Sequence, residues 1–335
     1  MGSSVVSCFA KELPSRCVTN DDLSKLMDTS DEWISQRTGI KTRFWAEAPL
    51  GTSDLATAAA TRTLELAGQP QVDAIIAATL SPDFSFPGIG VQVQHKLGLE
   101  QIPAYDIRNQ CSGYLYGLEM ADALVRAGTY ERILFVCAEI HSTGLDVSTR
   151  GRDLAVLFGD GAGSCLVEAE SASRSELKLR VRGTKLHSNG AYVEELWCEC
   201  PGSAHYPKRI TPEMIADGKV FPHMNGKKVF EQAIKSMVET SKSLLTKLGL
   251  TSSDVNLFVP HQANLRINSM VGEMLGLTSE QIFNTIERYG NTTAATIPIG
   301  MTDAVAVGRI KRGDIVLHAA FGSGFTWGAA VLEAV

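Results

Sequence analysis

The sequence predicts a layered α/β fold made of two similar halves, and two observations support this prediction. Segments with the apolar periodicity of helices alternate along most of the chain with short apolar runs typical of buried strands. The order of these segments also repeats after about 180 residues, so that Gly128 in one half corresponds to Gly308 in the other. We therefore expect loops from both halves to line one common site.

Each half is predicted to contain the same elements in the same order: helix, glycine turn and strand, then a second helix, a short strand, and a closing helix, turn and strand. The corresponding ranges are 55–80 and 230–261, 91–99 and 267–277, 102–107 and 281–286, and 120–139 and 301–321. The second helices end alike, at Gly98 and Gly276, since a helix end often needs a residue that adopts the left-handed conformation.

The repeat pairs Cys111 with Asn291, each just after a predicted strand and at the start of a predicted helix. His261 directly follows another apolar strand, "NLFVP". In open α/β sheets, ligands bind beyond the carboxyl ends of the strands. These three side chains are therefore expected to face a common crevice.

Cys111 lies in "NQCSGYLYGL", at what is predicted to be the first turn of a helix. Unpaired N–H groups there favour negative charge, so we expect a lowered thiol pKa and a nucleophilic role. Gly113 and Gly117 follow in the same helix at a cost of about 1 kcal/mol each relative to alanine, which indicates a close approach to the backbone. The alternative is a small buried structural cysteine.

A Cys, His and Asn set fits acyl transfer, because a thiolate can attack a thioester while an imidazole and an amide donate hydrogen bonds to the developing oxyanion. Asn291 could equally cap the helix that follows it. A hydrolase of the Cys-His type also fits these three residues. Spacing alone leaves these alternatives open.

Two glycine-rich segments are predicted to be turns. "FGDGAG", residues 158–163, lacks the Lys-Ser/Thr ending of a phosphate loop, so we expect a turn where two backbones pass closely. "FGSGF", residues 321–325, either reverses the chain or aims backbone N–H groups at a substrate oxygen. Neither segment predicts a nucleotide site.

Composition excludes several classes of function. The 335-residue chain has a net charge of −6, which argues against a nucleic-acid surface, and no apolar run reaches the roughly 18 to 20 residues of a membrane span. The start, "MGSSVVSCFA", lacks the features of a signal peptide, and we expect a cytoplasmic protein. The seven cysteines are predicted to be free thiols. Cys198 and Cys200 lack a convincing second ligand pair, so no metal is predicted.

Six segments, taken in order, resemble the β-ketoacyl-acyl carrier protein synthase III family. They are "TSDEWISQRTGI", "NQCSGYLYGL", "STRGRDLAVLFGDGAG", "PHQANLRI", "GNTTAATIP" and "FGSGFTWG". The resemblance spans essentially the whole chain and implies a homodimer with the thiolase fold. That fold has α-β-α-β-α layers around a pseudo-twofold axis, here with halves at residues 1–170 and 171–335.

The resemblance also implies an acyltransferase that initiates fatty-acid synthesis. Cys111 would take an acyl group from coenzyme A (CoA), and malonyl-acyl carrier protein (malonyl-ACP) or malonyl-CoA would bind next. His261 and Asn291 would stabilise the enolate that decarboxylation produces, and its attack on acyl-Cys111 would give a 3-ketoacyl thioester. No cofactor is expected besides these thioester substrates.

The family's binding residues carry over to several positions of this chain. The backbone N–H groups of Cys111 and Ser323 match the oxyanion hole, and Phe321 matches the aromatic residue beside the malonyl group. Trp33 and Arg150 match the pair that sandwiches the adenine, and Arg37, Asn264 and Arg266 match contacts along the phosphates and pantetheine. Phe86 matches a residue that caps the partner's acyl pocket, which indicates a short acyl chain.

The chain departs from the family pattern in two places. Glu231, Glu273 and Met274 stand where basic residues often help to dock the acidic carrier protein, which should weaken that docking. An extended loop covers about 194–223. Both features resemble the branch that makes quinolone signals from an anthraniloyl starter. The alternative functions are therefore a secondary-metabolism enzyme with an aromatic or longer starter, perhaps using malonyl-CoA, and a non-catalytic acyl-CoA-binding protein.

Overall fold

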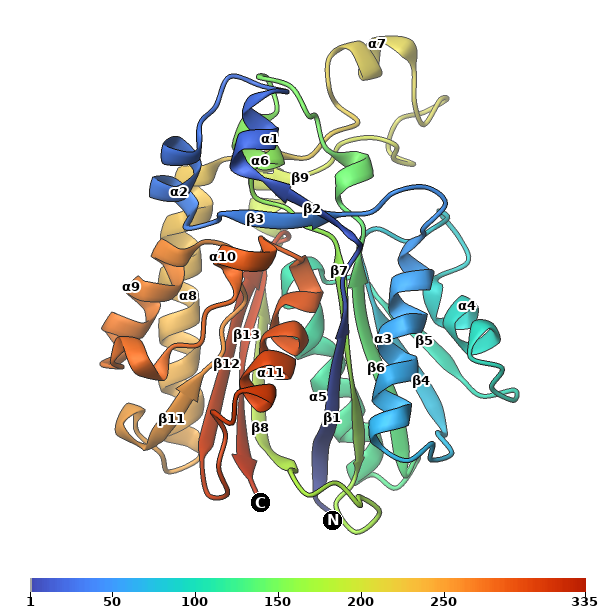
Figure 1. Cartoon of the computed structure of the whole chain (residues 1–335), viewed down its shortest axis with the longest axis vertical. Helices are drawn as coiled ribbons and strands as arrows, with labels where there is room; N and C mark the ends of the chain where they lie inside the picture. The colour runs from blue at the N-terminus through green and yellow to red at the C-terminus, as the bar shows by residue number, and fades with distance from the viewer. Residues whose placement is uncertain (1) are drawn as a thin grey trace.

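The structure is a computed structural model that describes residues 2–335, and its centre is a nine-stranded sheet (Figure 1). The strand order is β11-β12-β13-β8-β1-β7-β6-β4-β5. The bounds are β1 Ser4–Glu12, β4 Ala74–Ala78, β5 Ala104–Ile107, β6 Arg132–Glu139, β7 Gly161–Ala169, β8 Leu179–Ser188, β11 Val255–Phe258, β12 Ile315–Gly322 and β13 Thr326–Ala334. Strands from residues 1–170 occupy one side of this order, and strands from residues 171–335 occupy the other.

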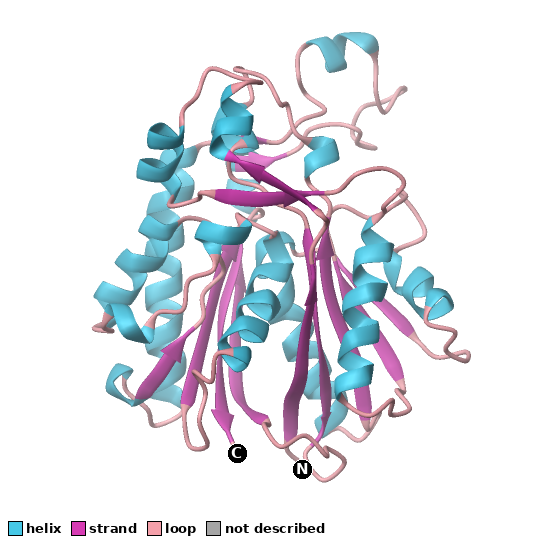
Figure 2. Ribbon diagram, viewed as in Figure 1, coloured by secondary structure: helices cyan, strands magenta, loops and turns pink. Residues whose placement is uncertain are grey.

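Helices cover both faces of the sheet (Figure 2). Their bounds are α1 Asn20–Ser24, α2 Asp31–Thr38, α3 Thr52–Leu66, α4 Ile89–Lys96, α5 Gly113–Arg126, α6 Arg152–Ala155, α7 Pro212–Ala216, α8 Gly226–Lys247, α9 Leu265–Leu275, α10 Ile286–Tyr289 and α11 Thr296–Ala306. Two small sheets complete the fold, β2 (Arg16–Thr19) with β3 (Thr42–Trp45) and β9 (Leu196–Trp197) with β10 (His223–Met224).

The buried side chains divide into layers, because successive residues of a strand point to opposite faces. In β6, Leu134 packs with α3 and α4, whereas Phe135 belongs to the central core that contains α5 and α11. In β12, Val316 faces the same central core, whereas Leu317 packs with α8 and α9. Two helix layers therefore lie outside the strands and one lies between the two sides of the sheet, which confirms the predicted layered α/β fold.

The junction between the two sides of the sheet is short. β1 pairs with β8 through Val5 and Val6, opposite Arg180 and Leu179. β1 pairs far more extensively with β7, from Ser4 to Glu12. The central helices α5 and α11, which Figure 1 shows near the middle of the molecule, therefore carry much of the packing between the two sides.

The predicted strand at 281–286 is wrong. This segment forms an isolated bridge between Ile282 and Phe258 and then enters α10. The side chain of Gln262 takes the place of a strand partner: its Oε1 accepts hydrogen bonds from the backbone N–H groups of Thr285 and Ile286, at 3.0 and 3.1 Å. A side-chain amide that satisfies backbone groups in this way removes the need for a sheet ladder.

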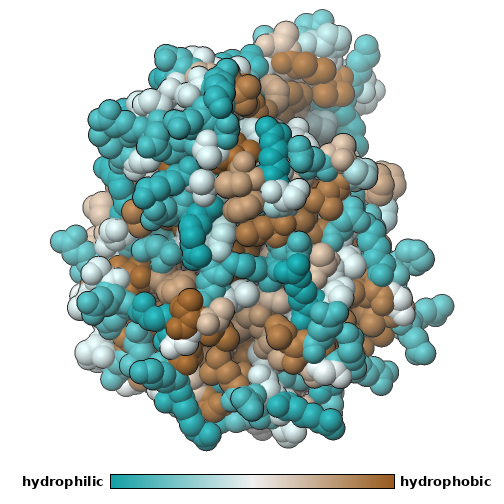
Figure 3. Space-filling view, viewed as in Figure 1, coloured by the Kyte–Doolittle hydropathy of each residue, from teal (hydrophilic) through white to brown (hydrophobic). Residues whose placement is uncertain are grey.

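The extended loop predicted at about 194–223 projects from one end of the molecule, at the top right of Figure 1. It is closed at its base by β9 and β10, where Trp197 pairs with His223. Apolar side chains gather on this projection in Figure 3, and Ile210 and Ile215 are among the exposed apolar residues there. Of the helices described, none combines the length and apolar character needed to cross a bilayer.

Candidate active site

Cys111 lies in a short 3-10 helix, Gln110–Ser112, between β5 and α5. Gln110 adopts a φ of +44°, which is uncommon for a residue with a side chain. Gly322, at the end of β12, lies directly against the cysteine: a Cβ added to it would stand 2.7 Å from the Cβ of Cys111. The turn after β12 therefore touches the predicted nucleophile, and only glycine fits at position 322.

The predicted close approach at the two glycines of α5 is confirmed. A Cβ on Gly113 would meet Ala294, and a Cβ on Gly117 would collide with the ring of Phe135. Both neighbours are protein side chains, so these glycines serve packing of the central helix layer.

The expected lowering of the Cys111 pKa is wrong in this structure. Cys111 is only 8% exposed, and burial raises the pKa of its thiol to about 12, with a further contribution from the charge of Glu139. A hydrogen bond from its own backbone N–H opposes this effect without cancelling it. The loss of solvation thus outweighs the favourable position at a helix start, and the resting group is the neutral thiol.

Glu139 is a buried carboxyl group at the end of β6 that the sequence did not single out. Its oxygens accept hydrogen bonds from the hydroxyl groups of Ser81 and Thr79, at 2.6 and 3.2 Å, and from the backbone N–H of Leu80, at 3.2 Å. Burial raises the pKa of Glu139 to about 7, although these hydrogen bonds lower it. This group therefore changes charge near neutral pH, and its charge acts on the Cys111 thiol.

His261 follows β11, and its backbone N–H donates to the carbonyl of Ala319 at 2.9 Å. Its Nδ1 pairs with the hydroxyl of Thr296 at 2.7 Å, whereas Nε2 is buried without a hydrogen-bond partner among the described residues. Burial lowers the pKa of His261 to about 3, so the ring is neutral at pH 7. An unpartnered, buried ring nitrogen of this kind is available to a substrate.

Asn291 is held by the segment that was predicted to be a close turn. Its backbone N–H donates to Leu157 at 2.8 Å, and its carbonyl accepts from the N–H of Gly159 at 3.1 Å. A Cβ on Gly159 would collide with the carbonyl of Tyr289, which confirms the close passage predicted for 158–163. The Asn291 side-chain oxygen accepts from the N–H of Thr293 at 2.8 Å, so its NH₂ group is the one left to face a ligand.

The structure brings Cys111, His261 and Asn291 together. The 3-10 helix Thr293–Ala295, just before α11, packs against the 3-10 helix that holds Cys111. Asn291 is hydrogen-bonded to one end of this turn, and His261 is hydrogen-bonded to Thr296 at the other. The Cys111 thiol and two neutral polar groups, supplied by three separate segments, therefore lie around one position.

Residues 321–323 lie where the β12–β13 turn meets this position. Phe321 is buried, with its ring centroid 4.7 Å from that of Phe325. The hydroxyl of Ser323 donates to the carbonyl of Leu196, at the base of the projecting loop. The Ser323 side chain is thus occupied by the loop, and the neighbouring Gly322 is the residue of this turn that contacts Cys111.

Only some of the residues expected to bind coenzyme A lie in contact with one another. The guanidinium carbons of Arg37 and Arg152 lie 4.3 and 4.9 Å from the centroid of the Trp33 ring. Asn264 links two expected contacts, because its amide donates to the carbonyl of Arg37 at 2.9 Å and its oxygen accepts from the N–H of Arg266 at 2.9 Å.

Arg150, the expected partner of Trp33, is bound to other groups. Its side chain donates to Asp146 at 2.5 Å and to the carbonyl of Ala216 in the projecting loop at 3.1 Å. Arg152 was missed by the sequence analysis, although "TRGRD" offers both arginines two residues apart. Phe86 is 82% exposed, ahead of α4.

The positions that depart from the family pattern lie on the surface. Glu231 and Glu273 are exposed on α8 and α9, and Met274 is half exposed. The guanidinium of Arg266 lies nearby on α9, 5.4 Å from the centroid of the Phe230 ring.

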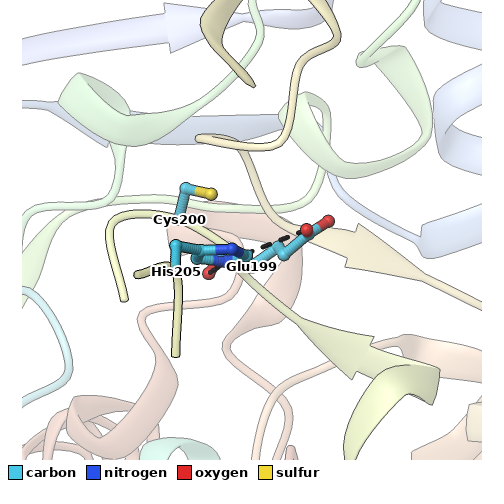
Figure 4. Close-up of side chains that lie close together, drawn as sticks. All are labelled: Glu199, Cys200 and His205. Carbon is cyan, nitrogen blue, oxygen red and sulfur yellow. Dashed lines mark hydrogen bonds and ion pairs between the residues drawn. The ribbon is translucent and has the colours of Figure 1, made fainter. Parts of the chain in front are cut away.

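Glu199, Cys200 and His205 in the projecting loop have potential metal-ligand atoms within 4.8 Å of one another (Figure 4). The Glu199 carboxylate already pairs with the ammonium group of Lys219 at 2.9 Å. The His205 Nε2 lies 3.1 Å from the backbone oxygen of Glu199, and the Cys200 sulfur lies 3.5 Å from that of Met214. A cation would have to displace an ammonium group from its partner, so we assign no ion to this cluster.

Family models and solved structures agree with the geometry. Residues 105–190 match the model described as "3-Oxoacyl-[acyl-carrier-protein (ACP)] synthase III", and residues 245–334 match its C-terminal counterpart. A beta-ketoacyl-[acyl-carrier-protein] synthase III of Helicobacter hepaticus is 41% identical over 328 residues, covering 97% of this chain and 96% of the relative.

Two solved structures are similar over almost their whole length. The 3-oxoacyl-[acyl-carrier-protein] synthase III of Aquifex aeolicus superposes with a TM-score of 0.88 at 37% identity, covering 98% of this chain and 99% of the other. The corresponding synthase of Thermus thermophilus gives a TM-score of 0.87 at 39% identity, covering 98% of both chains.

Proposed function

The chain belongs to the 3-oxoacyl-[acyl-carrier-protein] synthase III family and has its thiolase fold, and from that premise we propose how its own residues carry out the reaction. It is an acyltransferase that joins an acyl-CoA starter to malonyl-ACP by decarboxylative Claisen condensation, the step that initiates fatty-acid synthesis. The observation that carries the assignment of residues is the meeting of Cys111, His261 and Asn291 around one position.

In the first step, the Cys111 sulfur attacks the carbonyl of the acyl-CoA thioester. The backbone N–H groups of Cys111 and Ser323 donate hydrogen bonds to the oxyanion, which stabilises the tetrahedral intermediate. The bond to the coenzyme sulfur then breaks, and the proton from the cysteine leaves on that sulfur. Because burial raises the pKa of the resting thiol, Cys111 loses its proton only when the thioester is bound and the sulfur attacks it.

In the second step, a malonyl thioester occupies the same site beside Phe321. Its carboxylate leaves as carbon dioxide, and the electron pair of the broken C–C bond forms an enolate. The amide of Asn291 and the Nε2 of His261 donate to the enolate oxygen. His261 carries its hydrogen on Nε2 in this step, which requires the Thr296 hydroxyl to turn its single hydrogen from the carbonyl of Thr293 to Nδ1. The enolate carbon attacks acyl-Cys111, and the cysteine sulfur leaves to give the 3-ketoacyl thioester.

We further propose that Trp33, Arg37, Arg150, Asn264 and Arg266 contact the coenzyme, and that Phe86 caps the acyl pocket of a second copy in a cytoplasmic homodimer. The exposure of Phe86 supports a role outside its own core. Thioesters are the substrates, and the mechanism above uses only groups of the chain itself. Neither the geometry nor the relatives favour an aromatic or longer starter.

Intact-protein mass spectrometry after incubation with acyl-CoA thioesters, from acetyl through octanoyl and with anthraniloyl included, tests this function. We expect a short-chain adduct that is absent from Cys111→Ala, and a 3-ketoacyl product after malonyl-ACP is added. An adduct with long or aromatic donors alone would instead establish the secondary-metabolism alternative. Release of free acid without condensation would identify a hydrolase. The absence of any adduct would instead indicate a non-catalytic acyl-CoA-binding protein.

A further inference from the structure

Thr293 has a backbone conformation that its side chain disfavours. Its φ is +50°, and it is a β-branched residue with no exposed surface. A non-glycine residue in this region costs about 1–3 kcal/mol and persists only where its surroundings hold it in place. Such strain at the entrance to α11, within the candidate active site, calls for a physical reason.

The strained backbone holds both groups that are assigned to the enolate. The N–H of Thr293 donates to the side-chain oxygen of Asn291 at 2.8 Å, which turns the Asn291 NH₂ group outward. The Thr296 hydroxyl oxygen lies 2.9 Å from the carbonyl of Thr293 and 2.7 Å from Nδ1 of His261, and its single hydrogen is donated to the carbonyl at rest and to Nδ1 when Nε2 donates to the enolate. One peptide unit of Thr293 thus orients the Asn291 amide, and the other positions the hydroxyl that contacts His261.

His141 holds Thr293 from behind. Its Nε2 forms a hydrogen bond with the Thr293 hydroxyl, and its ring packs on Phe158 with centroids 4.5 Å apart. The backbone N–H of His141 donates to Asp160 at 2.7 Å, which fixes the base of the side chain. Oε2 of Glu139 lies 4.0 Å from the same Nε2. His141 is therefore anchored by packing on Phe158 and by its backbone hydrogen bond to Asp160.

We propose that Thr293 and His141 are positioning residues for the condensation step, with the His141–Thr293 hydrogen bond keeping Asn291 and His261 aimed at the enolate. This inference rests on the proposed function, because it needs those two residues to act on the malonyl group. Acylation should not depend on these two residues, since Cys111 takes its oxyanion donors from its own backbone and from the β12–β13 turn. Neither residue touches substrate in this scheme.

The test uses Thr293→Val, which keeps the shape and removes the hydroxyl, and His141→Phe, which keeps an aromatic ring against Phe158. We expect each to lower kcat for condensation about 100-fold, the loss typical of a displaced catalytic group, while acylation of Cys111 measured by mass spectrometry stays within about twofold. Thr293→Ser and His141→Gln retain a hydrogen-bonding group and should recover most of the condensation rate.

Thr302→Val serves as the matched control, because it removes a threonine hydroxyl from the following helix α11, one that donates to the backbone carbonyl of Pro298 within the same helix. It should change neither rate. A parallel fall of acylation, condensation and melting temperature in Thr293→Val and His141→Phe would overturn the positioning role in favour of a general structural one, and unchanged condensation would overturn it outright. A wild-type protein that acylates but makes no 3-ketoacyl product would refute the proposed function itself, and the positioning role with it.

Discussion

At the start of α5 the chain passes through Gln110 with a φ of +44°, and at the start of α11 it passes through Thr293 with a φ of +50°. Each residue opens a 3-10 turn that leads into one of the two central helices. Gln110 is partly exposed and its side chain makes a weak contact with the carbonyl of Arg108 at 3.3 Å, whereas Thr293 is fully buried and bound to His141. Two related parts of the molecule thus share a backbone strain but support it differently.

The difference follows from what each turn presents. The first turn itself contains the proposed nucleophile, Cys111, next to Gly322. The second turn carries no nucleophile and instead orients the side chains of Asn291 and His261, which come from other segments. Orienting two side chains requires a more rigid support than presenting one. This requirement explains why Thr293, in the second turn, is the one that is buried and hydrogen-bonded to His141. Burial keeps Cys111 and His261 uncharged at rest.

The largest effect is expected from Cys111→Ala, because it removes the sulfur atom that becomes acylated in the proposed mechanism. We expect complete loss of the acyl adduct with every donor, measured by intact-protein mass spectrometry. Peptide mapping of the wild-type adduct supplies the control. An adduct that persists in the variant would show that another cysteine is the nucleophile.

His261→Ala should separate the two turns. We expect acylation to continue, while condensation with the malonyl thioester falls about 100- to 1000-fold, the usual cost of one donor to an oxyanion. Stopped-flow or quench measurements of each half-reaction provide the comparison. If acylation stops as well, the division of roles between the two turns is wrong.

Glu139→Gln should raise the reactivity of Cys111 in a defined pH range. The pKa of Glu139 is raised to about 7, so its negative charge opposes the thiolate above pH 7 and is largely absent below it. We expect iodoacetamide to label Cys111 several-fold faster in the variant at pH 8 to 9, and equally fast in both proteins at pH 6. Site-resolved mass spectrometry measures the rates. An equal ratio at all pH values would exclude the charge of Glu139 as the cause.

The smallest effect concerns the strain itself. Gln110→Gly should raise the free energy of unfolding by about 0.5 kcal/mol, because removing the left-handed strain of about 1–2 kcal/mol exceeds the entropy cost of glycine. Urea denaturation measures this change. Thr293→Gly relieves the same strain but also loses the hydroxyl, so its condensation rate should fall. A destabilised Gln110→Gly would mean that the positive φ is not strained there.

The sequence pattern by itself determined the layered fold and predicted the position of the nucleophile. Apolar periodicity identified most elements, because it depends on neighbours within a few residues, and the repeat of their order placed Cys111 and Asn291 at equivalent helix starts. The six sequence motifs also predicted the family, and the similar proteins confirm it. The strand expected at 281–286 failed because a distant side chain, Gln262, replaced its partner.

Only the tertiary structure decided the electrostatics and the supports of the site. The raised pKa of Cys111 arises from burial and from Glu139, which lies at the end of β6, so no feature of the local helix start could reveal it. Arg152 shares the ring of Trp33, whereas Arg150 is drawn to the projecting loop. His141 reaches Thr293 across 152 positions of the chain. Such contacts depend on how distant segments pack, and burial then sets their strength.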